Sequence, residues 1–340
     1  MNGRSRFRLR PAQAAAAVIA LVVFIAIPLG TGGFQTFQFA QVAAFVIVLI
    51  GLNILTGYSG QISLGQGAFM AVGAYTTALL VHNLGVPWAA TLPLAGLLAG
   101  VVGFLFGIPA LRLRGIYLAL ATFALALAVT PVLNNYDRFT GGHVGITLAP
   151  IQAPLGIELS NEQWLYFVDW VIAAILFLPA VWLVRTRTGR AWMAIRDSET
   201  AASANGINIA YYKTLAFGIS AFYAGVGGAL QMATVAYANP DNYQLTLSLQ
   251  LLLGAVIGGL GYAWGPIFGA LVVVWVPYFA EQAAGVHLGP ISFGGKPDIL
   301  FGIALILILL FAPSGIAGLV QRGVGRLRPA AKPAPEPAVE

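Results

Sequence analysis

Residues 88–108 read WAATLPLAGLLAGVVGFLFGI, a run of uncharged and mostly apolar residues. A helix needs about 20 such residues to cross the hydrocarbon core of a bilayer. Comparable runs recur along the chain. A transmembrane β-barrel would instead show segments of about ten residues with alternating hydrophobicity. The sequence therefore predicts an all-α fold, a polytopic bundle of membrane helices.

The composition of the whole chain agrees with this prediction. Of the 340 residues, 59% are hydrophobic and only 8% are charged, whereas roughly 25% of a soluble domain is charged. Soluble enzymes, secreted scaffolds and nucleic-acid-binding proteins are therefore excluded. The chain has no cysteine, which excludes disulfides and thiolate metal sites. Its three histidines lie far apart in the sequence and form no ligand pair.

The apolar runs divide the chain into ten expected transmembrane helices. They lie at about 12–29, 38–55, 66–82, 88–108, 116–134, 164–184, 214–234, 247–261, 265–281 and 298–312. The first run is too long for a signal peptide and lacks a cleavage site after it. We therefore expect a basic N-terminal segment at 1–11, one transmembrane domain at 12–312 and a tail at 313–340. The tail is rich in proline and alanine, and we expect disorder from about residue 329.

The positions of the basic residues orient these helices. With a cytoplasmic N-terminus, fifteen of the 17 basic residues fall in cytoplasmic segments, and only Arg138 and Lys296 fall outside. Cytoplasmic loops of membrane proteins carry this excess of Lys and Arg. Both termini are therefore expected in the cytoplasm. The net charge of +6 reports this topology, together with some attraction to anionic membrane lipid, and no nucleic acid is expected as a partner.

Signatures of energy-coupling chemistry are missing from the sequence. The one Gly-Lys pair, Gly295-Lys296, lacks both the earlier glycine and the following Ser or Thr of a Walker A motif. Asp169, Glu281 and Asp298 lie near the ends of expected helices, so no ionisable residue is evident at depth to couple transport to an ion. The chain is therefore not expected to be an enzyme, and another protein would supply energy for uphill transport.

A polar but uncharged, glycine-rich stretch at 51–69 separates the second and third expected helices. One interpretation is a cytoplasmic turn whose small residues let helices pack closely. The other is a broken or re-entrant segment at membrane depth, which is tolerated only where it is buried in protein or lines a water-filled cavity. In the second case this stretch lines the translocation path. Its candidate residues are Asn53, Gly57, Tyr58, Ser59, Gly60, Gln61, Ser63, Gly65 and Gln66.

The expected cytoplasmic loop at 185–213 has helix-forming residues from Arg190 to Ala204, with Gly206 placed as a helix C-cap. One interpretation is an interfacial helix with its basic residues at lipid headgroups. The other is a docking helix for a cytoplasmic partner. The candidate docking residues are Gly189, Arg190, Ile195, Arg196, Asp197, Glu199, Ala201, Ala202 and Gly206. Of these, we expect Ile195, Ala201 and Ala202 as apolar contacts, and Arg196, Asp197 and Glu199 as rim charges.

Two further glycine-rich stretches lie elsewhere in the chain. Thr140, Gly141 and Gly142 lie in the largest expected outside loop. They form either a flexible turn or a contact with an extracytoplasmic partner or the entering solute. The stretch at 258–270 joins two expected helices in a tight inside turn, for which close helix packing is the favoured interpretation.

Together these motifs resemble the permease subunits of branched-chain amino acid ABC importers, and most closely the M-type of the two permeases. The resembling stretches are 57–65, 111–119, 140–146, 189–208 and 258–266, in the order in which that family has them.

The resemblance implies a transport complex of several subunits in the cell inner membrane. A second homologous permease, two cytoplasmic ATPases and a periplasmic or extracytoplasmic substrate-binding protein would be partners. The chain itself would hold no cofactor, ATP would be used by the ATPases, and the loop at 185–213 would be the coupling loop. The alternative function is a stand-alone channel or facilitator for a small polar solute such as urea or an amide, which needs no docking loop.

Overall fold

The computed structural model describes residues 22, 24–113, 115–153, 159–284, 302, 306, 310 and 315–326. The long helices are α2 (Gly33–Leu52), α3 (Gln66–Leu84), α4 (Trp88–Ala110), α5 (Ile116–Asn135), α7 (Asn161–Arg185), α10 (Ile209–Val235), α11 (Leu245–Gly258) and α12 (Gly265–Ala284). They coincide with the eight inner helices expected from the sequence, mostly within two or three residues at each end. The first and last expected helices, the basic N-terminus and the tail from residue 329 lie largely outside the described residues, so a total of ten stays a prediction. The protein is a polytopic helical membrane protein.

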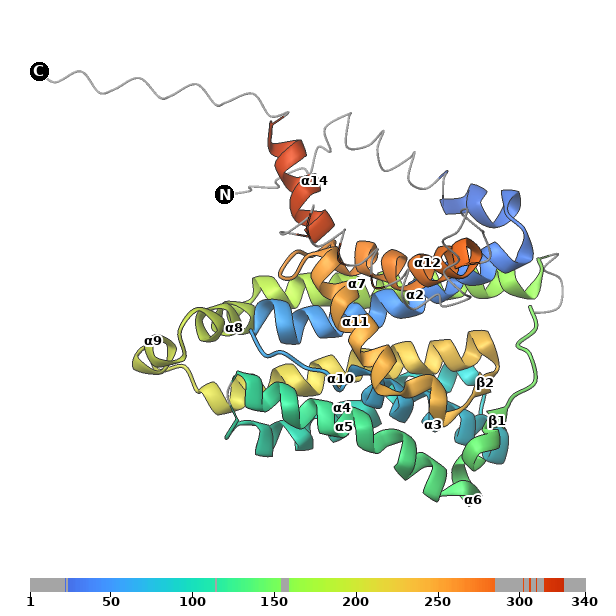
Figure 1. Ribbon diagram of the computed structural model, residues 1–340, viewed down its shortest axis with the longest axis horizontal. Helices are drawn as coiled ribbons and strands as arrows, with labels where there is room; N and C mark the ends of the chain where they lie inside the picture. Colours follow the sequence, from blue (N-terminus) through green and yellow to red (C-terminus); the bar gives the residue numbers. More distant parts are fainter. Residues whose placement is uncertain are drawn as a thin grey trace, which may run out of the picture.

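Helix α10 lies at the centre of the bundle, against α2, α3 and α4 (Figure 1). Its 27 residues span roughly 40 Å at about 1.5 Å per residue, enough to cross a bilayer. Small residues permit this central packing. A Cβ added to Gly73 of α3 would lie 2.0 Å from the carbonyl oxygen of Gly225, and one added to Gly228 would lie 2.1 Å from that of Met70. Membrane helices associate through such close backbone approach.

The outer helices carry exposed apolar side chains instead of a charged surface. Leu98 and Leu105 of α4, Leu127 of α5, and Ile175 and Leu178 of α7 are exposed. In a soluble protein so many exposed apolar residues would mark an interaction site. In this bundle they fit the hydrocarbon of a membrane.

The short elements gather at the two ends of the bundle. At one end, α8 (Arg187–Asp197) and α9 (Glu199–Ala204) project beyond the long helices (Figure 1, left). At the other end lie α6 (Asp137–Thr140), the 3-10 helices η2 (Gly142–Val144) and η3 (Pro240–Tyr243), and the antiparallel strands β1 (Ile146–Thr147) and β2 (Tyr237–Ala238). Helix α14 (Gly315–Arg326) lies against α11 and α12. The basic loop at 185–213 and the described part of the outside loop, 136–153, are thus at opposite ends.

Candidate functional site

The glycine-rich stretch does not form a simple surface turn. Helix α2 continues as a π-helix, η1 (Asn53–Tyr58), and the chain from Ser59 to Gly65 is not helical. The first residue of α3 then lies deep in the bundle, because the side-chain amide of Gln66 donates to the carbonyl oxygens of Val48 and Ser220, each at 3.4 Å. Val48 lies ten residues before Tyr58 in the same continuous helix. The chain therefore turns back into the bundle before α3 begins.

Polar side chains of this stretch are buried and bonded to one another. Ser59, Gln61, Ser63 and Gln66 are all nearly inaccessible. The amide of Gln61 donates to the Ser59 hydroxyl at 2.7 Å, and the amide N–H of Gly65 donates to the Ser63 hydroxyl at 3.3 Å. The stretch thus combines a non-helical backbone with buried polar side chains, as the re-entrant interpretation expects, while Gly60 and Ile62 between them are exposed. Its role as part of a translocation path stays a prediction.

A polar cavity lies between parts of this stretch and the expected coupling loop at 185–213. Its volume is about 290 Å³, and three segments of the chain line it. They are the glycine-rich stretch, the connection from α4 to α5, and the segment from α8 to the start of α10. The lining residues are Ser59, Gly60, Gln61 and Ile62; Leu113, Gly115 and Leu118; and Ile195, Arg196, Asp197, Ser198, Glu199 and Lys213. Two groups of candidate residues far apart in sequence are thus neighbours.

An ion pair closes one wall of this cavity. The buried Lys213 ammonium of α10 donates to the carboxylate of Glu199 at the start of α9. The carbonyl oxygen of Lys213 also accepts a 3.4 Å hydrogen bond from the Gln61 side chain. Because a buried ammonium without a partner costs several kcal/mol, this pair fixes α9 against α10. Glu199 therefore faces this chain's own bundle, which corrects its expected place among the rim charges.

The coupling loop forms two helices where the sequence predicted one. Ser198 has an extended backbone and its hydroxyl accepts from the amide of Ala201, so it ends α8 and caps α9. Gly206 ends the helix as the sequence predicted, although the C-cap is Asn205 and Gly206 is the residue directly after it. Gly206 has φ +78°, its amide donates to Ser203, and the amide of Ile207 donates to Ala202, which is the Schellman pattern.

Burial divides the expected docking residues into two sets. Ile195 and Ala202 are only 2% and 3% exposed, because α8 and α9 pack them against this chain. The expectation that these two side chains contact a partner is wrong for this conformation. Arg190, Asp197, Ala201 and Gly206 are exposed, and Gly189 is buried against the backbone of Val184. The surface open to a partner is therefore the polar face of α8 and α9.

Arg196 connects the coupling loop to the π-helix. Its Nη1 donates a 3.0 Å hydrogen bond to the carbonyl oxygen of Gly57, and its Nε and Nη2 donate to Asp197 at 3.2 Å. The sequence places Arg196 at an outer rim, whereas its guanidinium reaches inward to η1. No pattern in the sequence pairs Arg196 with Gly57, because the two residues are 139 positions apart.

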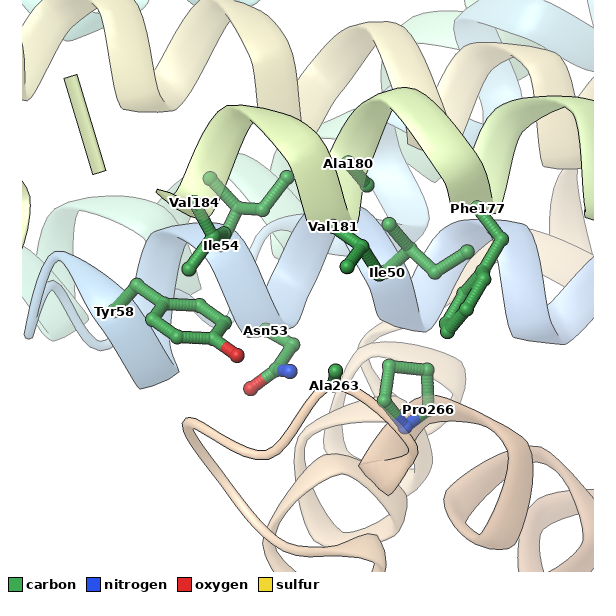
Figure 2. Close-up of a pocket in the computed structure, with 10 residues that line it drawn as sticks. All are labelled: Ile50, Asn53, Ile54, Tyr58, Phe177, Ala180, Val181, Val184, Ala263 and Pro266. Carbon is green, nitrogen blue, oxygen red and sulfur yellow. The ribbon is translucent and has the colours of Figure 1, made fainter. Parts of the chain in front are cut away.

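Asn53 connects the π-helix to the turn between α11 and α12. Its side-chain Nδ2 donates to the carbonyl oxygen of Tyr262 at 2.9 Å. Its Oδ1 accepts from the backbone amide of Gly261 at 2.8 Å. Tyr58 and Asn53 point toward Ala263 in this turn and Pro266 at the start of α12 (Figure 2). These four residues line a cavity of about 20 Å³. A lone asparagine in an apolar run was the signal for a buried polar contact, but its partner was not predictable.

The turn at 258–270 has the close packing that the sequence favoured. A Cβ on Gly258 would lie 2.2 Å from the carbonyl oxygen of Gly265, and one on Gly269 would lie 2.4 Å from that of Gly254. Only glycine permits α11 and α12 to approach this closely.

Residues 140–142 form an ordered turn at the opposite end. The Thr140 hydroxyl donates to the carbonyl oxygens of Leu133 and Tyr136, at 2.6 and 3.0 Å. Gly141 and Gly142 have φ of +72° and +53°, a backbone conformation that glycine adopts at low cost. The turn interpretation accounts for these residues, and contact with a partner or solute stays a prediction.

Asp169 lies deeper than the sequence analysis placed it. It is the ninth residue of α7 and is wholly buried. One carboxyl oxygen accepts from Thr234 of α10 at 2.8 Å, and the other has no hydrogen-bond partner. The described helices therefore do hold an ionisable group at depth, which corrects the expectation from its position in the sequence.

Comparison with known proteins identifies the family. The family model of the branched-chain amino acid transport system permease component matches residues 36–312. The high-affinity branched-chain amino acid transport system permease protein LivM of Escherichia coli (strain K12) is 31% identical over 300 residues, covering 82% of this chain and 68% of that protein. The chain belongs to this permease family.

More distant relatives of the permease include both types. A probable branched-chain amino acid transport permease protein LivM of Methanocaldococcus jannaschii is 26% identical over 317 residues, covering 80% of this chain and 90% of the relative. The permease protein LivH of Salmonella typhimurium is 25% identical over 291 residues, covering 81% and 92%. No solved structure matches the chain. The protein is thus a permease subunit of an ABC importer, a transport subunit rather than an enzyme.

Proposed function

We propose that this permease forms part of the translocation path for branched-chain amino acids, paired with a second homologous permease in the cell inner membrane. The family match over residues 36–312 is the observation that carries the proposal. The relatives that match include both LivM and LivH, which supports a partner of the second type. The cargo class follows from the printed names of these relatives.

Two cytoplasmic ATPases would bind at α8 and α9 and use the ATP, and the permease itself would hold no cofactor. The exposed polar face of these helices supports this assignment. Arg190 is exposed, the side chain of Asp197 is 71% exposed, and charges at the rim of an interface chiefly govern specificity. A binding protein would deliver the amino acid at the opposite end, near β1 and β2. A stand-alone facilitator, the alternative function, would have no use for the docking face.

Reconstitution tests the proposal. The permease, the second permease and both ATPases are placed in liposomes with the binding protein outside, and uptake of labelled leucine is measured with and without internal ATP. We expect accumulation only with ATP and with all subunits present. Omitting the ATPases is the control. Equal uptake by the permease alone would favour the facilitator, and uptake of urea but not leucine would overturn the cargo class.

A further inference from the structure

The π-helix η1 contacts two separate parts of the fold. It accepts a hydrogen bond from α8 through the Gly57 carbonyl oxygen, and its Asn53 side chain makes two hydrogen bonds with the turn between α11 and α12. A π-helix is a rare conformation that frequently marks a functional site. Its backbone hydrogen bonds join residues five apart, whereas those of an α-helix join residues four apart. A shift of η1 by one residue would therefore convert it to α-helical hydrogen bonding.

Close contacts at two glycines accompany these hydrogen bonds. A Cβ added to Gly57 would lie 2.2 Å from Asn53 Oδ1 and 2.5 Å from the amide nitrogen of Gly261. A Cβ added to Gly60 would lie 2.7 Å from Cγ of Arg196. The side chains of Arg196 and Asn53 are thus held directly against the backbone of their neighbours. Arg196 thus gives α8 a direct contact with η1, and Asn53 gives η1 a direct contact with the turn at 259–262.

We propose that Arg196, the Gly57 carbonyl and Asn53 form a coupling clamp that transmits movement of α8 to η1 and to the turn between α11 and α12. This inference rests on the proposed function, because it assigns the moving force to an ATPase bound at α8 and α9. Arg196 and Asn53 are positioning residues. Their role is to connect the docking face to two segments of the membrane domain through these contacts.

Arginine suits this position better than lysine. Its planar group donates to Gly57 through Nη1 and to Asp197 through Nε and Nη2 at the same time. Asp197 thereby holds the guanidinium in the orientation that reaches η1. A lysine ammonium lacks the rigid fork of donors, so it can replace one of these bonds but cannot keep the geometry of both.

The test uses the complete importer in liposomes with three variants. Arg196→Gln removes the charge-assisted bond to Gly57, Arg196→Lys keeps one donor, and Asn53→Asp keeps the acceptor for Gly261 but loses the donor to Tyr262. Arg112→Gln is the matched control, an exposed arginine at the same end of the bundle. Recovery of bound ATPases, ATP hydrolysis and leucine uptake are measured for each.

We expect Arg196→Gln to retain its ATPases and at least half of the ATP hydrolysis, while leucine transported per ATP falls roughly tenfold, the change expected for one charge-assisted hydrogen bond. Arg196→Lys should lose less, Asn53→Asp should lose coupling in the same way, and Arg112→Gln should match the unmodified protein. Unchanged transport per ATP in Arg196→Gln would overturn the clamp. Loss of the bound ATPases in Arg196→Gln would also overturn it, since Arg196 would then be a docking residue.

A second measurement follows the movement itself. The chain has no cysteine, so a single cysteine at the partly exposed Ala263 reports on the turn between α11 and α12. Its rate of labelling by a thiol reagent should change on adding ATP, and this change should vanish in the Arg196→Gln background. If ATP still changes the labelling rate in the Arg196→Gln background, the clamp is contradicted but the proposed function is not. Leucine uptake by the unmodified permease without any ATPase would instead contradict the proposed function.

Discussion

Gly60 and Gly65 are both candidate residues of the glycine-rich stretch, but the structure gives them different constraints. Gly60 has φ +73° and an added Cβ would lie 2.7 Å from Arg196. Gly65 has φ −102°, and an added Cβ would lie 3.1 Å from the Thr122 carbonyl oxygen. A left-handed backbone costs an L-residue about 1–2 kcal/mol. We therefore expect Gly60→Ala to reduce leucine uptake several-fold and Gly65→Ala to reduce it less.

Both variants should still assemble with the other subunits, because Gly60 lies at the surface of the bundle and Gly65 needs shifts of only a few tenths of an ångström. Gel filtration of the purified complex checks assembly, and initial uptake rates in liposomes check function. The reverse order of the two variants would show that the packing against α5 at Gly65 matters more than the backbone at Gly60.

At the scale of single residues, the sequence identified the polar stretch but not how its groups are used. Ser59, Gln61 and Ser63 were selected as candidates for the lining of the translocation path. The structure shows the Gln61 amide bonded to the Ser59 hydroxyl and the Ser63 hydroxyl bonded to Gly65. These local bonds depend on the path of the backbone, which runs back into the bundle. That path depends in turn on distant partners such as Ser220, whose carbonyl oxygen accepts a hydrogen bond from Gln66, 154 positions earlier in the sequence.

Among the helical elements, α9 is short and depends on few bonds. The amide of Ala202 donates to Ser198 at 3.0 Å, and its methyl group is buried. Proline at position 202 removes this donor and clashes with the preceding turn, at a cost of about 3 kcal/mol, which should unfold α9. We expect Ala202→Pro to insert into the membrane but to lose ATP-dependent uptake and stimulation of ATP hydrolysis.

Thr200→Pro is the control for this variant, since the first turn of a helix tolerates proline and Thr200 is exposed. ATP hydrolysis and leucine uptake are compared in the same liposomes. Undiminished uptake by Ala202→Pro would remove α9 from the coupling path.

The elements also show which parts of the fold a sequence can predict. Residues 88–108 and 116–134 were predicted almost to the residue as α4 and α5, because a long apolar run has one stable form in a membrane, where every backbone group must be bonded internally. The break at Ser198 was not predicted, although a serine before Glu199 is a typical N-cap. The π-helix at 53–58 was not predictable, because it depends on contacts with Arg196 and with the turn at 259–262.

At the scale of the whole molecule, the two ends of the bundle differ in charge. The end with α8 and α9 brings together Arg112 and the five basic residues of the coupling loop, although α5 and α7 separate the two groups in sequence. Among the described residues, Arg138 is the basic side chain at the end with β1 and β2. The sequence predicted this segregation from the helix parity, and the structure reproduces the parity from α2 to α12.

The orientation of the bundle in the membrane follows from its charges, because a bundle placed either way round in a bilayer would have the same internal contacts. The excess of Lys and Arg marks the cytoplasmic side, so the end with α8 and α9 should face the cytoplasm. Fusions of green fluorescent protein after Gly206 or after Arg326 should fluoresce, whereas alkaline phosphatase should be active when fused after Gly85 or near Glu158. Exchanging the two reporters at each site is the control, and each should then be silent. Phosphatase activity after Gly206 would invert the bundle and place the docking face for the ATPases on the wrong side, whereas a cytoplasmic result near Glu158 would remove the parity on which the ten-helix prediction depends.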